Sequence, residues 1–167
     1  MSIRNGGASR PQLVLAATPP PEQRPLLTSH DYARLELVCF EQLDLLNPMT
    51  PFVRAKLAEA RVIPATEIPG TVATLGSIVR YRIEDRMLER RILQLDARHT
   101  PNGHYLSALT PIGLALLGRS AGDICEAELF NGAKLKIAIA LVEHQPEAEI
   151  RRRAQGSRPG DDGPEAA

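Results

Sequence analysis

Histidines are the side chains of this sequence that most readily suggest metal or acid–base chemistry. They are spread along the chain, as His30, His99, His104 and His144. A zinc site needs three or four ligands that come together, and no cysteine or acid stands at a convincing ligand spacing from them. His99 and His104 flank a predicted turn, so we interpret the histidines as residues of surface loops. We therefore predict no metal site.

The two cysteines, Cys39 and Cys125, lie far apart and also lack a metal-ligand spacing. We interpret both as small apolar residues of a protein in a reducing compartment. No Gly-rich phosphate loop and no nucleophile motif occurs in the sequence, so we predict no catalytic residue, no cofactor and no enzyme activity. The apolar run 13–17 is too short for a signal peptide, and no run approaches the roughly 20 residues of a membrane helix. These patterns predict a cytoplasmic protein.

Two acids near a predicted turn could also do chemistry. Glu41 and Asp44 precede the segment "NPMTP", and on one helix their spacing of three would place them on the same face. Either they form an ordinary solvated face or they act together at the tip of a hairpin. Both interpretations stay open.

A helical hairpin over residues 26–63 would carry these acids. Thr28 or Ser29 can cap a first helix of about 16 residues, roughly 24 Å long. After the turn, Thr50 suits the N-cap of a second, shorter helix, and Pro51 suits its first position. Apolar residues at helical spacing form two stripes, Tyr32, Leu35, Cys39, Leu43 and Leu46 in the first helix and Val53, Leu57 and Ala60 in the second.

A sheet should follow the connector 64–77, because the hydrophobic period changes to two. The alternation of Val79, Tyr81 and Ile83 with polar residues predicts a half-buried strand with a wet face at Arg80, Arg82 and Glu84. Further strands are predicted over about 89–96 and from Tyr105 to Leu109. Asn131-Gly132 predicts a hairpin into a last strand, in which Leu135, Ile137, Ile139 and Leu141 alternate with other residues. The sheet is expected to be antiparallel, which gives an α+β fold.

The stretch "LTPIGLALLGRSAGDI", residues 109–124, predicts one short buried helix inserted in the sheet. Thr110 can cap it, Pro111 fits its first position and Gly118 fits its left-handed end. Ile112, Ala115 and Leu116 form its main apolar face, widened by Leu114 and Leu117.

The termini have a different composition from this ordered part. Residues 1–25 contain Gly and Pro runs and are predicted to be a disordered lead, and residues 149–167 a disordered tail. The triplet 151–153, three arginines, could instead be an interaction arm. Lysine plus arginine equals aspartate plus glutamate at 20 each, which disfavours binding of nucleic acid through a broad basic face.

The short-helix stretch resembles the signature of the Gre-type transcription elongation factors, Ser-Pro-Ile-x-x-Ala-Leu-(Leu/Ile)-Gly-x-x-x-Gly-Asp. The order "KLAEARVIPATEIP", "VATLGSIVRYR", "ALTPIGLALLG" and "VEHQPEA" resembles the short-hairpin branch of that family, the regulators of nucleoside diphosphate kinase. The resemblance covers about residues 26–148. Thr110 replaces the usual Ser, while Pro111, Ile112, Ala115, Leu116, Leu117, Gly118, Gly122 and Asp123 match.

The resemblance implies an FKBP-like domain over residues 64–148, preceded by the hairpin as a short coiled coil. It further implies a monomer that binds RNA polymerase, with this domain on the rim of the secondary channel and the hairpin pointing into the pore. Thr110, Pro111, Gly122 and Asp123 are the expected polymerase contacts, and Glu41 and Asp44 the expected tip residues. The implied function is regulation of transcription, without direct sequence-specific binding of nucleic acid and without a membrane.

Gre factors carry two tip acids that help hold a second Mg²⁺ and activate water to cleave backtracked RNA. The hairpin of this chain is much shorter, so we expect binding without transcript cleavage. The family branch also implies an influence on nucleoside diphosphate kinase, for which these residues indicate no mechanism. An alternative is a generic interaction module that uses the sheet face. A prolyl isomerase is disfavoured because its pocket is lined by aromatics, and only 4% of this chain is aromatic.

Overall fold

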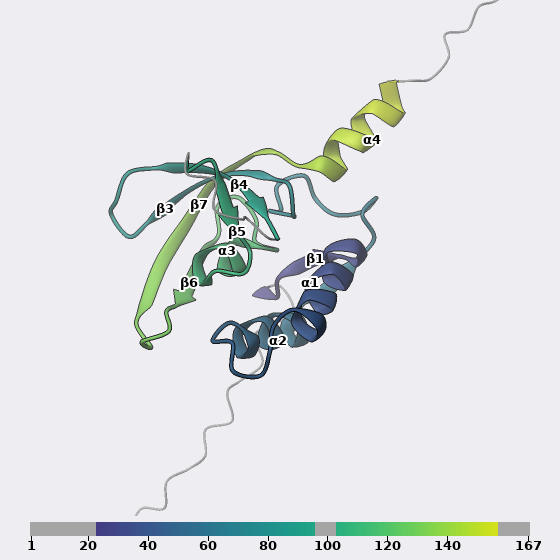
Figure 1. Ribbon diagram of the computed structural model, residues 1–167. Coiled ribbons are helices and arrows are strands. Elements are labelled where there is room, and N and C mark those ends of the chain that lie inside the picture. The colour runs from purple at the N-terminus through teal and green to yellow at the C-terminus, as the bar shows by residue number, and fades with distance from the viewer. Residues whose placement is uncertain (1–22, 96–102, 157–167) are drawn as a thin grey trace, which may run out of the picture.

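A computed structural model of the chain describes residues 23–95 and 103–156. Within them it has a pair of helices beside a five-stranded sheet, a short helix against that sheet, and a further helix at the C-terminal end (Figure 1). This mixed α+β architecture agrees with the predicted fold class. Most of the predicted lead, residues 1–22, and part of the predicted tail, residues 157–167, lie outside the described residues.

Helices α1 (Ser29–Glu41) and α2 (Thr50–Glu59) pack against each other. The hydroxyl of Thr28 accepts a hydrogen bond from the backbone N–H of Asp31 at 3.0 Å, so Thr28 is the cap that the sequence left undecided. Thr50 does not cap α2 as predicted. It is the first residue of that helix, and its hydroxyl donates to the carbonyl of Asp44 at 2.7 Å.

Helix α1 is shorter than predicted, because it ends at Glu41 after 13 residues. Its buried face is formed by Leu35, Val38 and Cys39. The predicted stripe does not continue to Leu46, whose side chain is 92% exposed. The chain instead turns, and the side chain of Asn47 accepts from the N–H of Met49 at 2.9 Å. Such side-chain bonds to nearby backbone compete with helix and favour turns.

A two-stranded parallel pair joins the base of the helices, and the sequence analysis missed it. Strand β1 (Leu26–Thr28) leads into α1, and β2 (Arg61–Ile63) follows α2. The N–H of Leu26 also donates to the carbonyl of Gly118 at 2.9 Å, which ties β1 to the segment after the short helix. Each strand has only three residues, too few for a period of two to be recognised.

The main sheet has the strand order β5-β4-β3-β7-β6. Its strands are β3 (Ile78–Ile83), β4 (Glu89–Gln94), β5 (Tyr105–Ser107), β6 (Ile124–Glu128) and β7 (Lys134–His144). The predicted alternation in β3 is confirmed, because Val79, Tyr81 and Ile83 are buried and the two arginines between them are exposed. The β6–β7 hairpin at Asn131-Gly132 is confirmed as well.

Two details of the sheet differ from the prediction. Strand β5 pairs with β4 in parallel, so the sheet is mixed and not wholly antiparallel. The alternation in β7 breaks after Ile139, because Arg80 pairs with Leu141 while Tyr81 pairs with Ile139. One extra residue bulges at this point, which turns Leu141 outward and lets Val142 pack against the core. Neither the strand direction nor the bulge follows from a hydrophobic period.

Helix α4 (Pro146–Gly156) replaces the first part of the predicted disordered tail. The guanidinium of Arg151 donates to the carbonyls of Ala65 and Ile68 at 2.7 and 2.8 Å, so the first residue of the arginine triplet holds the helix to the connector. Glu149 pairs with Arg152 and Arg153 at helical spacing. These contacts explain why a segment with nearly balanced charge is ordered here.

Candidate functional site

The tip of the helical pair places Glu41 and Asp44 in different structures. Glu41 is the last residue of α1, whereas Asp44 lies in the connection to α2, and both are exposed. The prediction that they share a helix face is therefore wrong, because the helix ends between them. One carboxylate oxygen of Asp44 accepts from the N–H of Leu46 at 2.8 Å. Asp44 thus shapes the turn, and only part of its carboxylate is free for other contacts.

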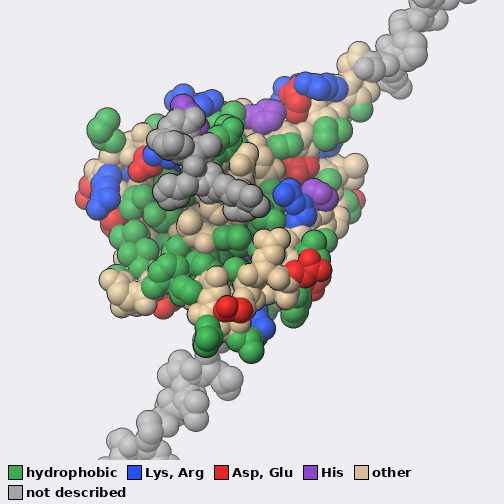
Figure 2. Space-filling view, viewed as in Figure 1, with side chains coloured by type: hydrophobic (Ala, Val, Ile, Leu, Met, Phe, Trp, Pro, Cys, Tyr) green, Lys and Arg blue, Asp and Glu red, His purple; other side chains and the backbone are tan. Residues whose placement is uncertain are grey.

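Leucines dominate the surface of this tip, which the sequence analysis did not foresee. Leu45 is 79% exposed and Leu46 is 92% exposed, and Phe40 on α1 is 70% exposed. Figure 2 shows acidic and hydrophobic side chains together at the lower end of the molecule, where the α1–α2 connection lies. The sequence does contain a signal for this exposed surface. Leu45 and Leu46 stand directly before Asn47-Pro48, a turn sequence past which a helix and its buried face do not continue. Such a tip can contact an apolar surface of a partner.

The first pair of rim candidates, Thr110 and Pro111, lies at the start of α3 (Pro111–Leu116). The Thr110 hydroxyl accepts from the N–H of Gly113 at 3.2 Å and donates to the carbonyl of Ser107 at 2.7 Å. The predicted cap is confirmed, and the hydroxyl is occupied within the fold. The predicted burial is only partly correct, because Leu114, Leu116 and Leu117 are the buried residues while Ile112 and Ala115 are half-buried.

The second pair, Gly122 and Asp123, lies in the turn between α3 and β6. Gly122 has a φ of +93° and its N–H donates to the carbonyl of Ile139 at 2.7 Å. The carboxylate of Asp123 accepts from the N–H of Ser120 at 2.8 Å. Pro111 and Asp123 line two different hollows, so the structure does not bring the two pairs into one pocket. Gly122 and Asp123 are nevertheless exposed and accessible to a partner.

A carboxylate-bridged arginine pair covers the wet face of the sheet. Arg80 of β3 lies directly opposite Arg90 of β4, a pairing of like charges that is unfavourable by itself. Glu143 of β7 pairs with both, and its contact with the Arg90 guanidinium is 2.6 Å long. Hydrogen bonds from the two arginines lower the pKa of Glu143. Glu143 therefore offsets part of the positive charge of the two arginines and holds them together.

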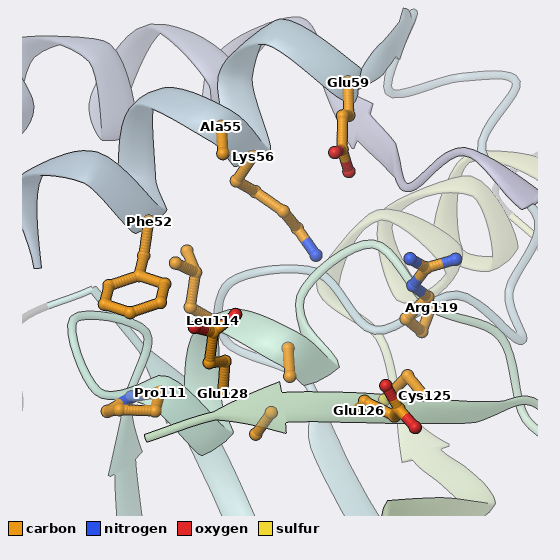
Figure 3. A pocket seen from close by; sticks show the side chains of 12 residues that line it. Phe52, Ala55, Lys56, Glu59, Pro111, Leu114, Arg119, Cys125, Glu126 and Glu128 are labelled. Carbon is orange, nitrogen blue, oxygen red and sulfur yellow. The ribbon is translucent and has the colours of Figure 1, made fainter. Parts of the chain in front are cut away.

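A pocket of about 270 Å³ lies between α2 on one side and α3 and β6 on the other (Figure 3). At one end the rings of Phe52 and Phe130 meet edge to face, with centroids 6.1 Å apart. Figure 2 shows hydrophobic side chains gathered over α3 and the β6–β7 turn on the same side of the molecule. The pocket therefore lies along the contact between the helical pair and the main sheet.

Lys56 is the unusual residue of this pocket, because its side chain is buried with a residue exposure of only 8%. Burial, together with repulsion from Arg119, lowers the pKa of Lys56 to about 7. Burial also raises the pKa of the nearby Cys125 thiol, which keeps it in the unreactive protonated form. Sequence reasoning missed Lys56, although it stands three residues after Val53 and four before Ala60 and so falls on the buried face of α2.

Residues 23–95 and 103–156 hold no cluster of three or more histidines, cysteines or acids that could bind a metal ion. His99 lies outside the described residues.

No helix in the described part of the chain combines the length and the apolar character that crossing a membrane requires.

Comparisons with known proteins agree with the resemblance in the sequence. The family described as "Transcription elongation factor, GreA/GreB, C-term" matches residues 68–144. The regulator of nucleoside diphosphate kinase of Escherichia coli (strain K12) is 29% identical over 124 residues, which are 74% of this chain and 91% of that protein. Transcription elongation factor GreA of Clostridium botulinum is 30% identical over 79 residues, 46% of this chain and 48% of that protein.

One solved structure extends the likeness to most of the described chain. It is the prokaryotic transcription elongation factor GreA/GreB from Nitrosomonas europaea, which is 34% identical and has a TM-score of 0.57. The match covers 72% of this chain and 98% of that one. The chain therefore belongs to the GreA/GreB family of transcription elongation factors.

Proposed function

We propose that this protein regulates transcription in the cytoplasm by binding RNA polymerase at the secondary channel. Membership in the GreA/GreB family supports RNA polymerase as the partner. The arrangement of a helical hairpin beside a sheet supports binding at the secondary channel. In this proposal the sheet, with α3, holds the rim of the channel as an FKBP-like domain. The α1–α2 hairpin then points into the pore. Thr110, Pro111, Gly122 and Asp123 are the proposed rim contacts.

The observation that carries this proposal is the exposed apolar tip. Leu45 and Leu46 are exposed at the end of a hairpin whose base is hydrogen-bonded, through Leu26, to Gly118 after α3. Two adjacent large apolar side chains at the end of a hairpin form an exposed apolar surface of the kind that partners bind. We infer that the tip contacts the channel wall through these leucines and that Asp44 sets the shape of the turn.

The length of the hairpin argues against transcript cleavage. At about 1.5 Å per residue, helices of 13 and 10 residues span roughly 20 and 15 Å. Oxygen ligands must lie within about 2.1 Å of Mg²⁺, so a tip that stops several ångströms short of the metal has no effect on it. Glu41 and Asp44 also do not lie on one helix face, because α1 ends at Glu41. The proposed effect is competition with other secondary-channel factors or tuning of elongation.

Retention on immobilised core RNA polymerase tests the proposal. The full chain should be retained, and a Leu45→Ser/Leu46→Ser variant should be retained less. Met87→Ser is the matched control, because Met87 is 87% exposed but lies in the turn between β3 and β4. The proposal fails if a folded wild-type protein is not retained. In a cleavage assay on stalled complexes, robust cleavage by the wild type would contradict the argument from hairpin length.

A generic interaction module that uses the sheet face is the second candidate. The exposed ion-pair network of Arg80, Arg90 and Glu143 favours it, because a rigid charged face suits many protein partners. In that case Glu143→Gln would weaken binding to the partner while the tip variant would bind normally. The opposite pattern supports insertion of the hairpin.

The relative from Escherichia coli also suggests an influence on nucleoside diphosphate kinase. We propose this as an indirect consequence of altered transcription, since no described residue indicates contact with a kinase. Measuring the kinase's transcript and protein in cells with and without this protein tests the link. A change in kinase activity without a change in either amount would contradict the indirect route.

A further inference from the structure

We propose that the pocket between α2, α3 and β6 binds a small carboxylate, held between the ammonium of Lys56 and the guanidinium of Arg119. This site is separate from the tip and from the rim candidates, except that Pro111 lines its edge. The proposal does not depend on binding to polymerase.

The first observation is a buried lysine without an acceptor. The side chain of Lys56 has no hydrogen bond and no ion pair with any of the described residues, although the residue is 92% buried. Its ammonium faces the pocket, and the hydration that it loses there is unfavourable unless an acceptor or an opposite charge compensates for it. Figure 3 shows the side chain reaching from α2 across the pocket, with its nitrogen on the side of Arg119.

The second observation is the state of Arg119, on the segment between α3 and β6. Its Nη1 donates to the carbonyl of Gln23, but its Nε is buried and has no acceptor among the described residues. Arg24, which lines the adjacent hollow together with Arg119, has a buried Nε without an acceptor as well. Two buried guanidinium N–H groups therefore lack an acceptor among the described residues, and buried donors are nearly always satisfied in native proteins.

The remaining charges of the pocket select the kind of anion. Glu59, Glu126 and Glu128 also line it, and all three are exposed. Glu126 is already paired with Lys134 at 3.5 Å. These acids repel a highly charged anion more strongly than a singly charged one. A carboxylate offers one charge and two acceptor oxygens, which suits an ammonium and a guanidinium on opposite sides.

The size of the pocket limits the ligand. A volume of 270 Å³ corresponds to the share of about nine water molecules in the liquid, at about 30 Å³ each. It lies below the range of about 300–1,000 Å³ that is usual for drug-sized ligands. A small organic acid fits, with its apolar part directed toward Phe52 and Leu114 on the pocket wall. Because the walls come from both the hairpin and the sheet, the ligand would hold the two together.

Titration of the full-length protein with sodium acetate, followed by backbone amide NMR, tests the proposal. Sodium chloride at equal ionic strength is the reference. We expect saturable shifts at Ala115, Cys125 and their neighbours, and a rise in the pKa of Lys56 when acetate is present. Lys56→Met and Arg119→Gln should each weaken binding by about tenfold or more, because each removes a charged hydrogen-bond donor.

Two matched variants control for a general loss of positive charge. Arg54→Met removes an exposed charge from the same helix, and Arg86→Gln removes one from the β3–β4 turn. Both should bind acetate within about twofold of the wild type, because neither lines the pocket. The proposal is overturned if acetate gives no saturable shifts, if Lys56→Met binds as well as the wild type, or if inorganic phosphate binds more tightly than acetate.

Discussion

The two ends of the α1–α2 hairpin are held in opposite ways. At the base, β1 and β2 pair with each other, and β1 is hydrogen-bonded to Gly118 beside the core helix α3. At the tip, the turn is held by local bonds of Asp44 and Asn47, and its leucines are exposed. The base is fixed by backbone contacts with distant parts of the chain, whereas the tip depends only on its own residues. This difference leaves the tip free to meet a partner without disturbing the fold.

Truncating one leucine in each region should give the largest contrast. Leu116 is fully buried beneath the sheet, so Leu116→Ala should lower the free energy of unfolding by about 2–5 kcal/mol. Leu46→Ala removes an exposed side chain and should change it by less than about 0.5 kcal/mol. Urea denaturation of both variants measures the difference. Equal losses would show that the tip is packed in solution, contrary to this account.

Two glycines test whether the base docks as closely as the structure shows. Gly118 and Gly122 both have positive φ, +82° and +93°, so alanine is strained at either position by about 1–2 kcal/mol. At Gly118 an added Cβ would also lie 2.9 Å from the carbonyl oxygen of Leu26, whereas at Gly122 it would meet nothing within 4 Å. Gly118→Ala should therefore lose about 1–3 kcal/mol more than Gly122→Ala in urea denaturation.

Equal losses for the two glycine variants would contradict the close approach of β1. The more informative measurement is hydrogen exchange at the amide of Leu26, which donates to Gly118. We expect faster exchange at this amide in Gly118→Ala and unchanged exchange in Gly122→Ala. The tip should be unaffected in both variants, because its bonds are local.

Lys56 allows the contact between hairpin and sheet to be tested by pH. Its folded pKa of about 7 lies below the ordinary value of 10.5, so between these values the unfolded state binds more protons. The contribution of Lys56 to the free energy of unfolding therefore rises with pH between about 7 and 10.5 and is constant below pH 7. In the absence of added carboxylate, Lys56→Met should be more stable than the wild type at pH 7. That advantage should shrink by about 2 kcal/mol or less by pH 9.

Urea denaturation of both proteins at pH 7 and pH 9 measures this change, because other groups contribute equally and cancel in the difference. Arg54→Met is again the control and should show no such dependence. A constant difference between wild type and Lys56→Met would show that the lysine is solvated and that the pocket is open to water.

Local patterns predicted most of the fold, and tertiary contacts account for what they missed. The β3 alternation, the Asn131-Gly132 turn and the Thr110 cap depend on neighbouring residues, and the structure confirms each of them. The β1–β2 pair, the parallel β5 and the bulge in β7 depend on which distant segments meet. Such pairings leave no period in the sequence. Helix α4 was missed because its charges nearly cancel and its anchors, Ala65 and Ile68, are far away in the chain.

The candidate sites show the same limit. The sequence was enough to place Glu41 and Asp44 near the tip of the hairpin. The prediction that they share a helix face failed because α1 ends at Glu41, before Asp44. Lys56 was mispredicted in the opposite direction. A lysine in an amphipathic helix is ordinarily expected on the solvated face. Only the approach of α3 and β6 buries it. A charged residue at a position of the apolar stripe is the signal that could have found it.

Photo-crosslinking from position 46 tests the central claim of an inserted tip most directly. A photoreactive amino acid replaces Leu46 in one protein, Met87 in a second and Arg80 in a third, and each is mixed with core RNA polymerase. The account predicts crosslinks to the walls of the secondary channel from position 46 only, and their loss when an excess of a cleavage-type Gre factor is added. Crosslinks from position 80 without any from position 46 would contradict it and would place the partner on the sheet.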